Sequence, residues 1–439
     1  MKKSVKSLEY YERARKRIPG ISQLLSKKPD MFAPGVWPGY FSKARGAETW
    51  DMDGNRFVDM SISGIGACVL GFCDPDVDRA VKGALDTGTM CSFNPPEEVE
   101  LAELLCELHP WAEKVRYGRS GGEAMAIAVR IVRAHQRKDK IAFCGYHGWH
   151  DWYLAANLAD EAHLDGHLLP GLSPLGVPRG LTGTAIPFSY NNLQELEGIL
   201  RKNRGEVAAI VMEPLRDSEP APGYLEGVKT LAKEHGCLLV FDEITAGFRL
   251  TTGGAHLRFG VEPDVAVFAK AISNGFPMAA IIGRGDVLSA AEDSFISSTY
   301  WTDRIGPVAA LATIQKHRAC NVADHLQKMG RLVQEGWKKA AAEASTAIHV
   351  SGIYPLSHFH FEGPMAMEKI TFFVQRMLEE GFLASGRFYA TYAHTEKHVQ
   401  EYLVAVRKVF GEIVQLEKAG QLAGALKGPV AQSGFKRLT

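Results

Sequence analysis

Short apolar runs alternate with helical stretches along the middle of this chain. Four nearly continuous apolar segments have the length of strands: residues 140–143, 207–212, 237–241 and 265–269. Between two of them, residues 225–235 have apolar side chains at helical spacing. Strands that alternate with helices in this way are typical of a parallel sheet covered by helices.

The two ends of the chain follow other patterns. Four further segments have the spacing or the boundary residues of helices: residues 5–17, 76–86, 97–108 and 396–418. Residues 48–59 are predicted to form a hairpin with its turn at 53–55, and residues 347–393 mix strands with a helix. The tail after Leu422 contains glycine and lysine, so we expect it to be loosely held.

Length and charge narrow the class of protein. A chain of 439 residues is too long for one ordinary core, so we expect two domains. Lysine plus arginine equals aspartate plus glutamate at 50 each, and this balance argues against binding to nucleic acid or to an anionic membrane. The charged start of the chain does not resemble a secretory signal, and we find no apolar stretch long enough to span a bilayer. A cytoplasmic enzyme is therefore expected.

The cysteines and histidines do not indicate a metal site. The seven cysteines are scattered singly, without a Cys-x-x-Cys pair, which favours buried thiols in a reducing cytoplasm over disulfides or zinc. His147, His150 and Asp151 lie close together in sequence, but they fit no standard ligand spacing. We expect no metal.

Chemically useful side chains follow the apolar runs. Lys270 follows one run, Asp242 follows another, and Glu213 follows a third. In parallel sheets, ligands bind at the carboxyl ends of the strands. A lysine amine can form a Schiff base with an aldehyde cofactor, and a carboxylate can keep a pyridine nitrogen protonated so that the ring takes up electrons. The pair Lys270 and Asp242 therefore predicts a cofactor of this kind.

A small-residue turn supplies a candidate phosphate site. Ser120-Gly121-Gly122 opens a predicted helix, where exposed amides can hold a phosphate. Each feature alone has a simpler reading, since Asp242 could cap a helix, Lys270 could be solvated and Tyr146 could belong to the core. Together they favour a phosphorylated pyridine aldehyde.

Ordered sequence strings carry a resemblance to a known family. They are Thr49-Trp-Asp-Met-Asp-Gly-Asn, Leu70-Gly71, Ser120-Gly121 with Glu123-Ala124, Tyr146-His147-Gly148, Glu213-Pro214, Phe241-Asp-Glu-Ile-Thr-Ala-Gly-Phe-Arg249, Pro263-Asp264 and Lys270. From about residue 8 to 300, and more loosely to 418, the chain resembles a class III aminotransferase of the fold-type I pyridoxal-phosphate enzymes. Within that class it is most similar to glutamate-1-semialdehyde aminomutase and its relatives.

The resemblance implies an α/β fold and a division into domains. The expected fold-type I architecture has a large domain with a mostly parallel seven-stranded sheet between helices, and a smaller α+β domain. Residues 66–305 would form the large domain that binds pyridoxal 5'-phosphate. Residues 1–65 would join the small domain, which residues 306–439 would complete. A homodimer with its active site at the interface is also implied.

The same resemblance assigns roles around the cofactor ring. Lys270 would carry the cofactor as an internal aldimine and move the proton, and Asp242 would pair with the ring nitrogen. Tyr146 would stack on one ring face and Ile244 would pack on the other. Glu213 would lie beneath the cofactor as a polar residue.

Further residues are implied at the phosphate end of the site. Gly121 and Gly122 would hold the phosphate through backbone amides, and Ser120 and His147 also belong to the expected cofactor-binding set. In this family a threonine of the partner subunit reaches the phosphate, and Ser298-Thr299 matches that position.

Several positions depart from the family pattern. The usual Ser-Gly-Thr is Ser120-Gly121-Gly122 here, which removes one hydroxyl contact to the phosphate, and the preceding asparagine is Arg119. Residues 23–28 contain no arginine for a substrate carboxylate, and a glutamate of the small domain is replaced by Gly386. These differences concern the substrate more than the cofactor.

Three functions remain open at this stage. The first is a transaminase, which moves an amino group from a small-molecule donor to a ketone or aldehyde acceptor in a ping-pong cycle. The second is an aminomutase of the semialdehyde type. The third is an idle pyridoxal-phosphate binder, against which the retention of Lys270, Asp242 and Glu213 argues.

Overall fold

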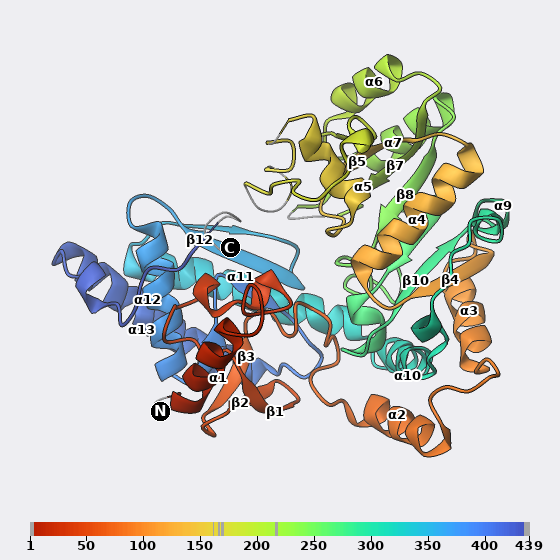
Figure 1. Cartoon of the computed structure of the whole chain (residues 1–439). Coiled ribbons are helices and arrows are strands. Elements are labelled where there is room, and N and C mark those ends of the chain that lie inside the picture. Colours follow the sequence, from red (N-terminus) through yellow and green to blue (C-terminus); the bar gives the residue numbers. More distant parts are fainter. Residues whose placement is uncertain (1–3, 161, 166, 168–170, 216–217, 434–439) are drawn as a thin grey trace. The chain divides into compact units, whose positions relative to one another are not determined.

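The chain forms two compact units, which we describe separately. The structure is a computed structural model that describes residues 4–160, 162–165, 167, 171–215 and 218–433 (Figure 1). One unit consists of residues 75–323. The other combines residues 1–74 with residues 324–439. The role expected for residues 66–305 as a cofactor-binding domain stays a prediction.

A seven-stranded sheet forms the centre of the 75–323 unit. Its strands, in sheet order, are β4 (Lys114–Gly118), β10 (Ala279–Gly283), β9 (Val265–Phe268), β8 (Leu238–Asp242), β7 (Val207–Met212), β5 (Lys140–Cys144) and β6 (Ala185–Pro187). β10 runs antiparallel to β4 and to β9, and the remaining neighbours are parallel. The mostly parallel sheet predicted from the alternation of strands and helices is confirmed.

Helices cover both faces of this sheet. Helix α4 (Gly121–Gln136) packs on one face, where Val211 and Val240 belong to its core cluster. Helices α6 (Leu193–Lys202) and α7 (Tyr224–Glu234) cover the other face, whose cluster includes Ile210 and Leu239. Consecutive strand residues thus face opposite cores, which is why these strands are apolar throughout their length.

The remaining helices of this unit flank the sheet. They are α2 (Pro75–Thr87), α3 (Glu97–Leu108), α5 (Asp151–Leu154), α8 (His256–Phe259), α9 (Gly285–Leu288) and α10 (Ile305–Ala319). Lys316 of α10 contacts Asp76 of α2 at 2.7 Å, and Arg304 contacts Glu97 of α3. The helices expected at 76–86 and 97–108 are confirmed.

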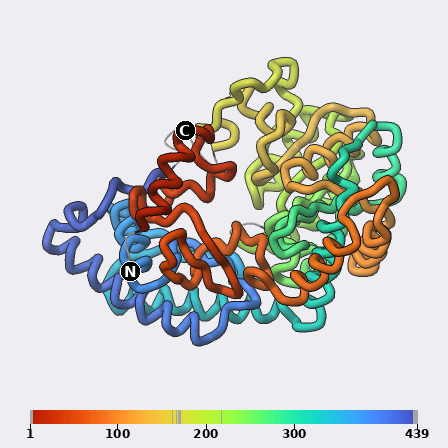
Figure 2. Tube along the Cα trace, turned by 60° about the horizontal axis from the view of Figure 1, so that its bottom comes forward, coloured from red at the N-terminus to blue at the C-terminus, as the bar shows by residue number. Residues whose placement is uncertain are grey.

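The second unit contains two small sheets and four longer helices. One sheet has the order β1 (Phe41–Arg45), β2 (Glu48–Asp51), β3 (Arg56–Met60) and β13 (Phe382–Ala384), and the other β11 (Ile348–Ser351), β12 (Leu356–Phe361) and β14 (Arg387–Tyr389). Its helices are α1 (Val5–Arg15), α11 (Val322–Ala344), which begins in the first unit, α12 (Ala366–Glu379) and α13 (Glu396–Lys418). β13 pairs in parallel with β3, so segments from the two ends of the chain share one sheet. In Figure 2, red N-terminal and blue C-terminal segments accordingly lie next to each other. The predicted hairpin and both terminal helices are confirmed.

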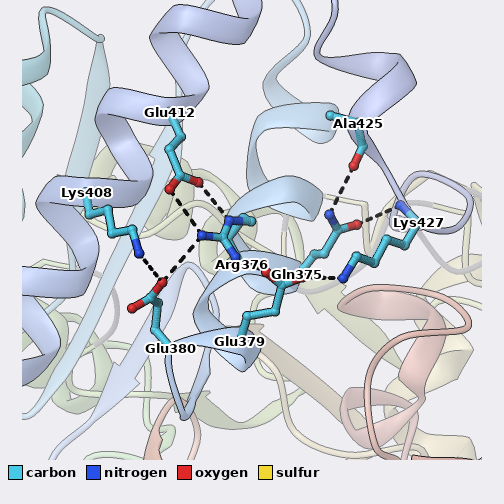
Figure 3. Close-up of polar contacts among 8 residues, drawn as sticks. All are labelled: Gln375, Arg376, Glu379, Glu380, Lys408, Glu412, Ala425 and Lys427. Carbon is cyan, nitrogen blue, oxygen red and sulfur yellow. Dashed lines mark hydrogen bonds and ion pairs between the residues drawn. The ribbon is translucent and has the colours of Figure 1, made fainter. Parts of the chain in front are cut away.

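The tail is held in place, contrary to expectation. The buried side chain of Gln375 donates to the carbonyl of Ala425 (3.0 Å) and accepts from the amide of Lys427 (2.7 Å), as Figure 3 shows. The amide of Ala431 donates to the Thr371 hydroxyl at 2.9 Å. The prediction of a loose tail is therefore wrong for the described residues up to 433. The local composition of the tail is typical of a loop, but side chains of the distant helix α12 form hydrogen bonds with backbone groups of the tail.

The same helix is joined to α13 by charge. Arg376 contacts Glu412 of α13 at 2.7 Å, and it also contacts Glu380, which Lys408 of α13 reaches at 2.7 Å (Figure 3). Several part-buried charges in one network fix the geometry of the helix pair better than an isolated exposed pair would.

Gly386 has a packing reason of its own. A Cβ atom at this position would lie 2.5 Å from the carbonyl oxygen of Phe359 in β12. The amide of Phe359 donates to the carbonyl of Gly386 at 2.8 Å. The two backbones approach so closely that a glutamate side chain could not replace the glycine without moving them.

Candidate active site

The predicted catalytic side chains share one edge of the seven-stranded sheet. Asp242 ends β8 and Lys270 follows β9, while Glu213 follows β7. The parallel register pairs Met212 with Phe241 and Asp242 with Val267, so these strand ends are neighbours. The structure therefore brings together three residues that lie 57 positions apart at most (270 − 213) and that the sequence singled out one by one.

Lys270 is turned into the site by its backbone. Its φ of +50° lies in the left-handed region, which costs a non-glycine residue about 1–2 kcal/mol. Ala269 and Ala271 on either side of it are buried. The lysine Nζ donates to the hydroxyl of Thr245 at 2.7 Å. Burial lowers the lysine pKa, and the nearby carboxylates of Asp242 and Glu213 act against that shift.

Asp242 is held by two contacts. The ring of His147 lies with Nδ1 2.8 Å from Oδ2 of Asp242, and the amide of Ile244 donates to Oδ1 at 3.0 Å. Asp242 is 3% exposed and His147 1% exposed, so both atoms of the pair are shielded from water. The other ring nitrogen of His147 lies 3.2 Å from the carbonyl of Cys144. His147 therefore fixes the orientation of the carboxylate.

Glu213 and Tyr146 meet at the end of the neighbouring strands. The amide of Tyr146 donates to Oε2 of Glu213 at 3.2 Å. Gly145 has a φ of +120°, and a Cβ atom there would lie 2.5 Å from the same oxygen. The Tyr146 side chain is 36% exposed, and burial, followed by the charges of Asp242 and Glu213, raises its pKa. Tyr146 is thus a rim residue rather than part of the core.

The N-terminus of α4 offers unpartnered amides. The carboxylate of Glu123 accepts from the amides of Arg119 (2.7 Å) and Ser120 (3.3 Å). The amides of Gly121 and Gly122 have no hydrogen-bond partner in the described part of the chain. A Cβ atom on Gly121 would lie 3.0 Å from the side chain of Ile244. This helix end can therefore accept an anion close to its backbone.

Thr299 lies apart from this group within the chain. It begins a short 3₁₀ helix, Thr299–Thr302, and it is exposed. In the described residues no hydrogen bond joins it to another candidate site residue. Arg119 donates instead to the carbonyls of Trp301 (2.8 Å) and Asp303 (2.7 Å), so the residue that replaces the family's asparagine anchors the end of this 3₁₀ helix.

A closed network lies behind the site and was missed by sequence reasoning. Glu243 is fully buried and accepts from the amides of Ala255 (2.9 Å) and His256 (3.0 Å). Nδ1 of His256 also donates to Glu243 at 2.7 Å, because its Nε2 accepts from the indole of Trp111 at 3.1 Å. Side chains alternate along a strand, so Glu243 and Asp242 point to opposite faces. This alternation is the signal in the sequence that could have placed Glu243 away from the cofactor site.

The comparisons with known proteins agree on one family. The sequence model described as aminotransferase class III matches residues 33–410. The 3-aminobutyryl-CoA aminotransferase of Cloacimonas acidaminovorans is 30% identical over 428 residues, covering 94% of this chain and 99% of the relative. The glutamate-1-semialdehyde 2,1-aminomutase of Roseiflexus castenholzii is 33% identical over 443 residues, with 95% and 100% covered.

A solved structure is similar over most of the length of the chain. It is the pyridoxal-phosphate internal aldimine form of the FumI protein of Sphingopyxis sp. MTA144, with a TM-score of 0.85 and 22% identity. The match covers 94% of this chain and 98% of that chain. At this identity the likeness shows the fold.

Proposed function

This chain belongs to the class III aminotransferases, a pyridoxal-phosphate-dependent enzyme family, and we propose that the edge of its seven-stranded sheet is the site of amino-group transfer. The observation that carries the proposal is the place of the half-buried Lys270 at the end of β9, next to Asp242 at the end of the neighbouring strand β8. When bound, the cofactor supplies an aldehyde for the lysine amine and a pyridine ring that takes up electrons from the substrate carbon.

The described residues fit this cofactor. The unpartnered amides of Gly121 and Gly122 suit its phosphate, and Ser120 opens the same turn. Ile244, which packs against Gly121, and Tyr146 at the rim would lie on the two faces of the ring.

The two carboxylates would have different roles, and His147 would act through one of them. Asp242, held by His147, would keep the ring nitrogen protonated. Glu213 would stay beneath the cofactor as a polar residue, because its Oε2 already accepts from the Tyr146 amide.

Lys270 then moves the substrate proton. Burial lowers its pKa, which makes the neutral amine more accessible near neutral pH. With the cofactor bound, the neutral amine would take a proton from the substrate carbon and return it two atoms further along, in a 1,3-prototropic shift. The hydroxyl of Thr245, which accepts from Nζ at 2.7 Å, orients the amine between these two events.

The substrates are a small-molecule amino donor and a carbonyl acceptor. An aminotransferase mixed with a donor and no acceptor should release one keto product per active site and then stop, because its cycle is ping-pong. A panel of α-, β- and ω-amino donors, with the keto product measured by chromatography, tests this. Continued release beyond one equivalent per active site in the absence of an acceptor, or no release with every donor, would contradict the transaminase function.

An aminomutase is the second candidate, favoured by the relative from Roseiflexus castenholzii. Residues 23–28 lack an arginine, and Lys28 is buried and already has a partner. A lysine cannot replace the planar, two-pronged grip of an arginine on a carboxylate. Glutamate-1-semialdehyde should therefore be a poor substrate. Its conversion to 5-aminolevulinate with a kcat/KM of roughly 10⁴ M⁻¹s⁻¹ or more would favour the aminomutase.

A homodimer would complete the site. Thr299 is exposed, and the partner subunit's Thr299 would reach the phosphate. Large apolar side chains of the 75–323 unit are also exposed, among them Phe93 (85%), Leu175 (88%) and Phe295 (90%). Exposed apolar side chains of this size are typical of an interface when they are contiguous. Light scattering should give twice the chain mass, and Phe295→Asp should shift it toward the monomer. A wild-type monomer with full cofactor occupancy would contradict the dimer.

A cytoplasmic location completes the proposal. All seven cysteines are free thiols, which suits a reducing compartment. Among the described helices, none combines the length and the apolar character needed to cross a membrane.

A further inference from the structure

Two histidines face each other across the strands β11 and β12. The register pairs His349 with His360, and the centroids of their rings are 5.0 Å apart at an interplanar angle of 36°. Both residues are exposed. Neither ring takes part in a hydrogen bond or an ion pair among the residues that the structure describes. Both imidazoles are therefore accessible to a ligand from solution.

The core fixes this pair on the open face of the three-stranded sheet. Side chains alternate along β12, and Phe359 and Phe361 on either side of His360 are buried. Both phenylalanines pack against Phe410 of α13, with ring centroids 5.8 and 5.3 Å apart. Residues directly opposite each other in an antiparallel pair have Cβ atoms about 4.5–5.5 Å apart. The backbone thus presents the two imidazoles side by side before any ligand binds.

Two neighbouring imidazoles suit a transition-metal ion. Imidazole is the commonest metal ligand in proteins, and it binds zinc, copper and nickel. A ligating nitrogen lies about 2.0–2.1 Å from a zinc ion, so two rings that share one ion have centroids within about 6 Å of each other. The observed separation of 5.0 Å meets this requirement. We propose that His349 and His360 form a binding site for one divalent ion of this group.

Water would fill the rest of the coordination sphere. In the described part of the chain, no group of three or more histidine, cysteine, aspartate or glutamate side chains could hold a metal, so the pair supplies two ligands. The amide of Glu362, two positions after His360, donates to the carbonyl of Ala347 at 3.0 Å and continues the same face of the sheet. Arg387 lies opposite His358, one row of the sheet away from the pair. The exposed carboxylate of Glu362 favours a cation at this face.

Sequence spacing does not indicate this site. The two histidines are 11 positions apart (360 − 349), which fits no standard ligand spacing, and the register of β11 and β12 brings their rings together. The expectation of no metal came from the cysteines and from the histidines near residue 147, which lies in the other unit. The proposed site belongs to the unit of residues 1–74 and 324–439, and it does not depend on the proposed aminotransferase function.

Nickel binding to the cofactor-loaded enzyme tests the site. The parent protein carries Cys73→Ser and Cys91→Ser, because these two exposed thiols would also bind nickel. It is compared with His349→Gln, His360→Gln and the double variant, each made in this parent. Isothermal titration calorimetry with nickel chloride near neutral pH measures the dissociation constant and the number of ions bound. Each single substitution should weaken binding roughly 10-fold or more, because even the loss of a hydrogen-bond partner of a metal ligand commonly costs about 10- to 100-fold.

Chelation by the pair predicts a specific pattern. The parent should bind one ion at this site, and each single variant should lose nearly as much affinity as the double variant, because one imidazole cannot chelate. Two independent imidazoles would instead bind two ions in the parent and one in each single variant at unchanged affinity, which would overturn the proposal. His235→Gln removes a partly exposed histidine of the other unit, so this matched control should bind nickel like the parent.

Thermal unfolding provides a second measurement. Without nickel, the midpoints of the parent and the variants should agree, because both side chains are exposed. Excess nickel should raise the midpoint of the parent more than that of any variant, since an ion that binds the folded chain stabilises it. Magnesium prefers oxygen ligands and should not distinguish the proteins. An equal rise with nickel in all proteins, or no binding to the parent up to about 1 mM nickel, would contradict the site.

Discussion

Two neighbouring carboxylates at the end of β8 have very different surroundings. Asp242 meets His147 and one backbone amide, and its charge acts on Lys270. Glu243 is surrounded on the opposite face by two backbone amides and His256, which Trp111 orients in turn. Both acids are almost fully buried. They differ in the groups on which each carboxylate acts.

The contrast separates a reactive arrangement from a structural one. Both oxygens of the Glu243 carboxylate accept hydrogen bonds from donors within the chain, which makes the strand end rigid. Asp242 is oriented by His147 but lies among groups of perturbed pKa, Lys270 and Tyr146, at the open edge of the sheet. Perturbed titratable groups that gather at a strand end are typical of a functional site.

Removal of the reactive amine should have the largest effect. Lys270→Ala should abolish the visible absorbance of the enzyme with pyridoxal phosphate and lower turnover by roughly 10³-fold or more, because no other described lysine lies at this edge. Absorbance spectra and steady-state assays measure both effects. The exposed Lys202→Ala is the control. A Lys270→Ala protein with its band and rate intact would show that the site is elsewhere.

Exchanging the front carboxylate for an amide should have the next largest effect. Asp242→Asn keeps the shape but cannot keep a ring nitrogen protonated, so kcat should fall by roughly 10²–10³-fold. The thermal midpoint should change little compared with this loss. Wild-type turnover in a cofactor-loaded Asp242→Asn enzyme would remove the electron-sink role.

Exchanging the buried carboxylate of Glu243 for an amide should lower stability more than it affects the cofactor site. Glu243→Gln loses charge-assisted hydrogen bonds from three donors, so the free energy of unfolding should fall by about 1.5–3 kcal/mol. Thermal unfolding by circular dichroism measures this, and cofactor spectra of the surviving folded protein should match wild type. If Glu243→Gln instead loses turnover as strongly as Asp242→Asn without destabilisation, the two carboxylates are not separated as we describe.

The last prediction concerns a pH dependence of the same back region, which leaves turnover at neutral pH unaffected. Burial lowers the pKa of His109 and of His317 to about 4, so both stay neutral in the folded chain. In the unfolded chain they take up protons below about pH 6.5. The stability that the two neutral histidines contribute is therefore complete above pH 6.5. The free energy of unfolding falls as the pH drops from 6.5 to 4, by about 1.4 kcal/mol per pH unit for each histidine.

Denaturant unfolding across that pH range tests the assignment. His109→Gln should be less stable than wild type at pH 7.5, because its Nε2 accepts from the amide of Gly254, but it should show a shallower loss toward pH 4. His360→Gln changes an exposed histidine and should leave the slope as it is. An unchanged slope in His109→Gln would contradict the buried neutral state.

The main helices and strands, and the chemical groups at the strand ends, could be predicted from the amino-acid sequence alone. Apolar periodicity is local, so the helix at 97–108 and the strand at 207–212 were predicted with the bounds that the structure has. Lys270, Asp242 and Glu213 could be singled out because each directly follows such a strand, and the ordered strings identified the family. Their roles stay predictions for the experiments above.

Which distant groups become neighbours could be read only from the three-dimensional structure. His150 lies beside Gly122, Trp111 reaches His256, and Gln375 holds the tail at Ala425, although each pair is far apart in the chain. No local pattern encodes such pairs, because sheet register and helix packing bring them together. Hydrogen bonding then selects among the groups that have become neighbours, since buried donors and acceptors are costly to leave unpaired.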